Sequence, residues 1–75
     1  MRDRDVRIAL GLSERDVARA ARLSRPMVFR FEAEPMRVGL RARARLLAYY
    51  AKRRDELAAR IAEEAGYEAV DAAAE

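Results

Sequence analysis

The sequence predicts an all-α fold, a compact domain of four to five helices that contains a helix-turn-helix and ends in a long helix. Two short segments with the same capping chemistry at their start lie eleven residues apart. A stretch rich in alanine, leucine and arginine follows them from 39 to 65, with no glycine or proline in its interior. The chain has 75 residues, 52% of them hydrophobic, which is enough for one modest core and no second domain.

The first helix is expected from about 3 to 10. Val6, Ala9 and Leu10 stand at helical spacing among charged residues, and Gly11 then supplies a C-terminal stop. Arg2 lies just before this helix and Arg4 in its first turn. These two arginines are candidates for a basic arm, although acidic residues beside them weaken that interpretation.

The second helix is expected to begin after Ser13. The serine hydroxyl can accept free backbone N–H groups of the first turn, where Glu14 and Asp16 also suit the positive end of the helix dipole. Val17 stands four residues beyond the serine. It can therefore form a hydrophobic staple with Leu12, which fixes the angle at which the chain enters the helix.

The third helix repeats this pattern after Ser24, with Leu23 and Val28 as the second staple. Pro26 in the first turn marks a helix start, because a proline there removes no intrahelical hydrogen bond. The helix should end near Ala33. Two stapled helices so close in sequence must cross sharply, which is typical of a helix-turn-helix that reads the DNA major groove.

Residues 34–38 are expected to form a loop before the long helix over 39–65. The charged run 52–56 interrupts the apolar face of that helix and allows a bend or a restart. The predicted organisation is a helix-turn-helix domain over 1–52, a helical extension over 53–66 that serves as a dimer or partner interface, and a frayed tail over 67–75.

The run from Leu12 to Glu32 resembles the helix-turn-helix of the phage-repressor and Cro type, also called the xenobiotic-response-element family. The resemblance weakens toward residue 50, where the family adds a helix that closes the core. It implies a DNA-binding regulator of bacterial or phage origin that inserts the helix over 24–33 into the major groove. The residues that carry it are Leu12, Ser13, Val17, Ala18, Ala21, Leu23, Ser24, Arg25, Val28, Arg30, Phe31 and Glu32.

The sequence departs from the family pattern at three places. Arg22 stands where the family usually has a turn glycine, which costs about 1 kcal/mol if the backbone is left-handed. Glu14 replaces a glutamine that often binds a phosphate, and its charge would repel one. Pro26 and Phe29 occupy reading positions where small polar residues are common, so base preferences cannot be copied from relatives.

Val28 and Phe31 are expected to point into the core, which leaves a different set of third-helix residues outside. We expect four base-reading residues, Arg25, Pro26, Phe29 and Arg30. Arg25 is the best candidate, because an arginine can donate two hydrogen bonds to guanine. The alternatives are a solvated Arg25, a Phe29 that packs under the loop at 35–36 or serves a protein interface, and an Arg30 that clamps a phosphate or pairs with Glu34.

A second group of residues is expected to hold the DNA sugar-phosphate backbone and so fix the register of the third helix. These backbone candidates are Ser24, Arg22, Arg37, Arg41 and Arg43. Solvation is the alternative for each arginine. Past the charged run, an apolar strip is expected to mediate homodimerisation or docking of a second protein, such as RNA polymerase, a co-regulator or a toxin. This interface would comprise Tyr50, Leu57, Ala58, Ile61 and Ala65.

The charge is polarised along the chain. Residues 1–45 carry a net charge of +6 and residues 46–75 a net charge of −3, which gives +3 overall. A basic front half suits duplex DNA. The abundance of arginine and alanine equally fits the codon bias of a GC-rich genome.

Composition argues against several other classes. The chain has no cysteine or histidine, so thiolate and imidazole chemistry are missing, and we expect neither an enzyme nor a metal or other cofactor. The sequence lacks an apolar run of transmembrane length, and residues 1–12 lack the apolar centre of a secretory signal. We therefore expect no membrane association and a cytoplasmic, nucleoid-associated location.

The predicted function is sequence-specific DNA binding that regulates transcription, as a repressor or an activator, with a homodimer on an inverted-repeat operator. Two rivals stay open. One is a helical protein–protein adaptor with Phe29, Met27 and Met36 as an apolar docking site. The other is an antitoxin-type repressor whose tail wraps a toxin.

Overall fold

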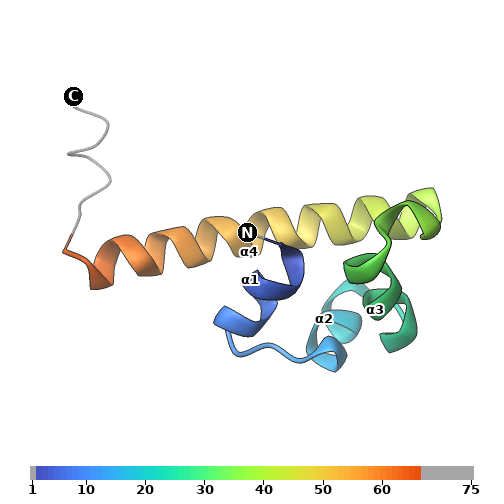
Figure 1. Cartoon of the computed structure of the whole chain (residues 1–75), viewed down its shortest axis with the longest axis horizontal. Helices are drawn as coiled ribbons and strands as arrows, with labels where there is room; N and C mark the ends of the chain where they lie inside the picture. Colours follow the sequence, from blue (N-terminus) through green and yellow to red (C-terminus); the bar gives the residue numbers. More distant parts are fainter. Residues whose placement is uncertain (1, 67–75) are drawn as a thin grey trace.

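The computed structural model describes residues 2–66, and this part of the chain is helical throughout, apart from short connections. The elements in order are α1 (Asp3–Ala9), α2 (Glu14–Ala21), α3 (Arg25–Ala33), a 3-10 turn η1 (Pro35–Arg37) and α4 (Leu40–Glu64). The three short helices gather on one side of α4, which runs along the 41 Å long axis of the molecule (Figure 1). The predicted all-α class with a long final helix is confirmed.

Serine caps begin both α2 and α3, as predicted. The Ser13 hydroxyl accepts a hydrogen bond from the Asp16 N–H at 3.0 Å, and the Asp16 carboxylate accepts one from the Ser13 N–H at 2.8 Å. This backbone hydrogen bond, together with the serine hydroxyl, lowers the pKa of Asp16. The Ser24 hydroxyl accepts from the Met27 N–H at 3.3 Å, so two free amides at helix starts are satisfied.

Two expectations for the second half of the chain need correction. The segment 34–38 is not an irregular loop, because Pro35 presets a helical φ and begins the 3-10 turn η1. The run 52–56 neither bends nor restarts the long helix, since α4 is continuous from Leu40 to Glu64. The charges there are accommodated by ion pairs, Arg53 with Glu56 at 2.8 Å and Arg54 with Asp3 of α1.

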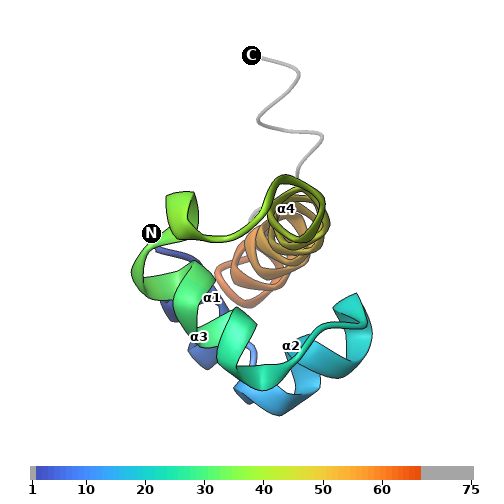
Figure 2. The ribbon, with the colours of Figure 1, turned by 90° about the vertical axis from the view of Figure 1, so that its right-hand side faces the viewer.

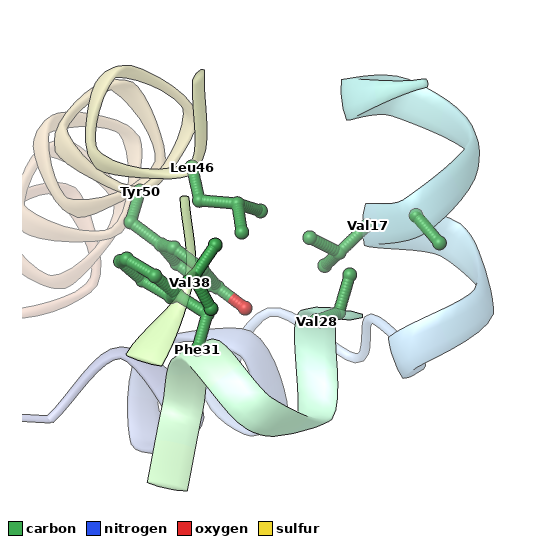
Figure 3. Packing of buried hydrophobic residues seen from close by; sticks show 7 residues of the cluster. Val17, Val28, Phe31, Val38, Leu46 and Tyr50 are labelled. Carbon is green, nitrogen blue, oxygen red and sulfur yellow. The ribbon is translucent and has the colours of Figure 1, made fainter. Parts of the chain in front are cut away.

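The hydrophobic core lies between α2, α3 and the first half of α4 (Figure 3). Phe31 and Tyr50 stack with their ring centroids 5.9 Å apart and their planes nearly parallel. Leu12 and Leu23, the outer members of the two expected staples, pack against the same cluster. The buried members are Val17, Ala18, Val28, Phe31, Val38, Leu46 and Tyr50.

A polar network at the edge of this core joins α1, α3 and α4. The Arg7 guanidinium donates to both carboxylate oxygens of Glu32, at 2.7 and 3.0 Å, and to the carbonyl of Leu12 at 3.1 Å. The Tyr50 hydroxyl donates to the same carboxylate. The side chains of Arg7 and Glu32 are only 11% and 5% exposed, so little water competes for these bonds.

Viewed along α4, the short helices wrap around one flank of the long helix (Figure 2). The opposite side of α4 is uncovered by any described element. The predicted frayed tail, 67–75, lies outside the described residues.

We predict that Glu32→Gln lowers the free energy of unfolding by about 3 kcal/mol, because the largely buried Arg7 guanidinium loses its counter-charge. Urea denaturation followed by circular dichroism measures this loss. Glu34→Gln is the matched control, since Glu34 is exposed and, among the described residues 2–66, pairs with exposed Arg37 alone. Equal stability of the two variants would show that the network does not hold the three helices together.

A second prediction concerns alkaline pH. Burial, and next the hydrogen bond to Glu32, raise the pKa of Tyr50 well above its ordinary value. The unfolded chain then releases the phenol proton near pH ~10 while the folded chain retains it. The free energy of unfolding should therefore be level below that pH and fall above it. Tyr50→Phe should remove most of this fall, whereas Tyr49→Phe should leave it in place.

Candidate nucleic-acid interface

The geometry of α3 follows from its cap and its two buried side chains. Ser24 fixes the start of the helix, and Val28 and Phe31 are 0% and 2% exposed on its inner side. The opposite side carries the four predicted base-reading residues, Arg25, Pro26, Phe29 and Arg30, and all four are exposed. The predicted division of this helix into a buried and an outer face is confirmed.

The turn between α2 and α3 is left-handed although it has no glycine. Arg22 adopts φ 57° and ψ 48°, and the next N–H, of Leu23, donates to the carbonyl of Ala18 at 2.8 Å. This geometry ends α2 and turns the chain into α3. The side chain of Arg22 is exposed, so this left-handed position also places a cation at the start of α3.

Glu14 and Arg25 lie together where α2 and α3 begin. The carboxylate of Glu14 is 3.7 Å from the guanidinium of Arg25, whose side chain is 60% exposed. Such a loose, solvated pair contributes little to stability. Glu14 nevertheless lowers the positive charge beside the best base-reading candidate, which adds to its expected repulsion of phosphate.

The structure excludes one alternative for Phe29 and one for Arg30. Phe29 is 63% exposed and does not lie buried under the segment at 35–36. Glu34 pairs with Arg37 at 3.6 Å and not with Arg30, which has no ion pair with any residue from 2 to 66. Both side chains are thus available to an external partner.

An open groove runs beside Phe29 between the starts of α1, α2 and α3. Its lining has an excess of positive charge, because five arginines, among them Arg2, Arg4, Arg15 and Arg25, outnumber the two glutamates Glu14 and Glu32. The position of Arg15 in this groove was not predicted, because nothing in the sequence shows that the second residue of α2 faces the start of α1.

The acidic residues next to the possible arm have partners of their own. Asp3 pairs with Arg54 of α4, and the Asp5 carboxylate accepts from the backbone N–H of Arg2 at 3.3 Å. The Arg54 guanidinium offsets the charge of Asp3, whereas Asp5 keeps its negative charge beside the two arginines. Arg2 and Arg4 both line the groove.

The predicted backbone-binding residues occupy both ends of α3. Arg22 and Ser24 lie at its N-terminal end, and the serine hydroxyl is occupied by capping. The others follow its C-terminal end, Arg37 in η1 and Arg41 and Arg43 in the first turn of α4. Arg41 is exposed, whereas Arg43 is half-buried with its guanidinium 3.3 Å from the Met36 sulfur.

The expected partner interface on α4 needs correction. Tyr50 is 1% exposed in the core and Leu57 is 9% exposed, so both serve the domain's own packing. They face inward because α1 also packs along α4, beside the Arg54–Asp3 pair. Ala58, Ile61 and Ala65 are exposed, as expected.

No family model, curated protein sequence or solved structure matches this chain. Among residues 2–66, no helix has both the length and the apolar character that crossing a bilayer requires. In the same range no cluster of acidic side chains is arranged to hold a metal ion.

We predict that Arg22→Gly raises the free energy of unfolding by about 0.5–1 kcal/mol. Glycine adopts the left-handed turn without strain, and the larger conformational entropy that glycine gives the unfolded chain offsets only part of this gain. Thermal denaturation measures the shift. Arg19→Gly, the same change inside α2, should instead lower stability by about 1 kcal/mol. Destabilisation by Arg22→Gly would show that the arginine side chain, not its backbone, matters at this turn.

Proposed function

We propose that this protein is a sequence-specific DNA-binding regulator of transcription that inserts α3 into the major groove. The observation that supports it best is the outer face of α3. Arg25, Phe29 and Arg30 are all exposed there, on a short capped helix held in place from behind by Val28 and Phe31. A helix of this kind, carried on a second helix across a tight turn, fits the width of the major groove.

The three side chains have different roles in this proposal. Arg25, at the N-terminal end of the helix, donates two hydrogen bonds to the O6 and N7 atoms of a guanine. Phe29 contacts a thymine methyl group. Arg30, the residue after Phe29, has no ion-pair partner within residues 2–66 and binds a phosphate.

The surrounding charge supports binding to a polyanion. Arg2, Arg4 and Arg15 line the groove beside the reading helix, and the backbone-binding candidates flank both of its ends. Contacts of this kind position a protein on duplex DNA without reading its sequence, and they make the affinity strongly salt-dependent.

A protein–protein adaptor is the second candidate, favoured by two exposed apolar side chains. Phe29 is 63% exposed and Met36 is 79% exposed, although Met27, the third expected member of this docking site, packs against the core. Salt separates the two functions. About six phosphate contacts give a log–log slope near −5, whereas an apolar contact changes little with salt.

We predict that selection of bound sequences from random duplex DNA yields a defined site, and that Arg25→Ala relaxes the preference at one base pair, at a cost of about 1–3 kcal/mol on the preferred site. Arg37→Ala should weaken all sequences alike, because it removes a phosphate contact. Arg60→Ala is the control, an exposed arginine on the distal half of α4. Equal losses on every sequence from Arg25→Ala would refute its assignment as a base reader.

A further inference from the structure

Helix α4 carries two separate faces, and among residues 2–66 only one of them packs into the apolar core. The inner face contains Leu46, Tyr50 and Leu57, all buried. The next residue after each of these lies about 100° further around the helix. That second direction defines a surface stripe that is apolar except at Arg54.

The stripe follows a strict seven-residue repeat along the whole helix. Alanine recurs at 44, 51, 58 and 65, and a larger side chain recurs at 40, 47, 54 and 61. The large residues are Leu40, Leu47, Arg54 and Ile61, and the three apolar ones are 73%, 54% and 51% exposed. All four alanines are exposed as well.

A spacing of alternately three and four residues is the pattern by which one helix packs along another over many turns. A helix that only covers its own domain does not need this pattern on its outer side. Helix α4 extends beyond the short helices (Figure 1), and the stripe continues along it as far as the C-cap residue Ala65.

We propose that this stripe is the contact surface for a second copy of the chain, and that the two α4 helices pair in antiparallel orientation. In that orientation each large side chain lies opposite an alanine of the other copy. Leu40 faces Ala65, Ala44 faces Ile61 and Leu47 faces Ala58, so that large and small residues interlock in every apolar layer.

Charge supports the same orientation. In this register Arg43 of one copy lies beside Glu64 of the other, at both ends of the paired region. A parallel pair would place Arg54 directly against Arg54 and would set alanine against alanine in alternate layers. It would therefore combine like charges with poor packing.

The antiparallel pair also places both domains on the same side. The inner face of α4, with Tyr50 and Leu57, flanks the stripe along one edge. In the antiparallel pair, this edge of one copy adjoins the same edge of the other copy. Both copies of α3 then project toward the same side of the helix pair. This arrangement does not depend on DNA binding, and it differs from the expected interface through Tyr50 and Leu57.

The test measures the mass of the full chain without DNA by sedimentation velocity at micromolar concentrations. A dimer of twice the 8.5 kDa chain mass is expected. Ala58→Glu should weaken self-association about 100-fold or more, since it places an unpaired charge in the contact of both copies. Ala59→Glu is the matched control, an adjacent exposed alanine outside the stripe, and should leave the dimer intact.

Single cysteines test the orientation, since the native chain has no cysteine. Ala51→Cys, near the centre of the pair, should form a disulfide-linked dimer under mild oxidation, whereas Leu40→Cys should not, because the two Leu40 positions lie at opposite ends. A monomeric wild-type chain, a dimer unaffected by Ala58→Glu, or crosslinking through Leu40→Cys would each overturn the proposal. DNA binding by a monomeric chain would overturn the dimer alone, and a dimer without DNA binding would overturn only the proposed function.

Discussion

The bidentate pair of Arg7 with Glu32, completed by the Tyr50 hydroxyl, is the interaction on which the arrangement of the helices depends. It ties together α1, α3 and α4, three elements far apart in the chain. In water such a pair would contribute little, but here it is largely shielded and every charged group has partners. The apolar cluster makes the domain compact, whereas this network fixes the rotation of α3 relative to α4. The orientation of the exposed side chains on the outer face of α3 follows from it.

Local signals were sufficient to predict the helices. The capping serines, Pro26 and the left-handed Gly11 each act within a few residues, so the sequence reveals them directly. The Arg7–Glu32–Tyr50 network could not be predicted, because its members are separated by 25 and 18 residues and each resembles an ordinary surface or core residue in isolation. The burial of Leu57 was missed for a related reason. Only the packing of α1 on α4 shows which side of the long helix is covered.

The candidate interface was predictable to the extent that it lies on one helix. The alternation of Val28 and Phe31 with outward residues is a property of α3 alone, and the exposure of Arg25 and Arg30 follows from it. The pairing of Arg25 with Glu14 and the basic groove with Arg15 involve neighbouring helices, and their geometry depends on the turn at Arg22. A resemblance to a family with glycine at that position indicated the turn but not which side chains would meet across it.

The division of α3 into two faces has an evolutionary consequence. The residues that anchor this helix, Val28 and Phe31, contribute nothing to its outer surface, and the outer residues contribute little to the core. Substitutions at 25, 29 and 30 are therefore nearly neutral for folding. A lineage carrying this scaffold can drift from one molecular target to another through single codon changes, without first acquiring compensating mutations elsewhere in the gene.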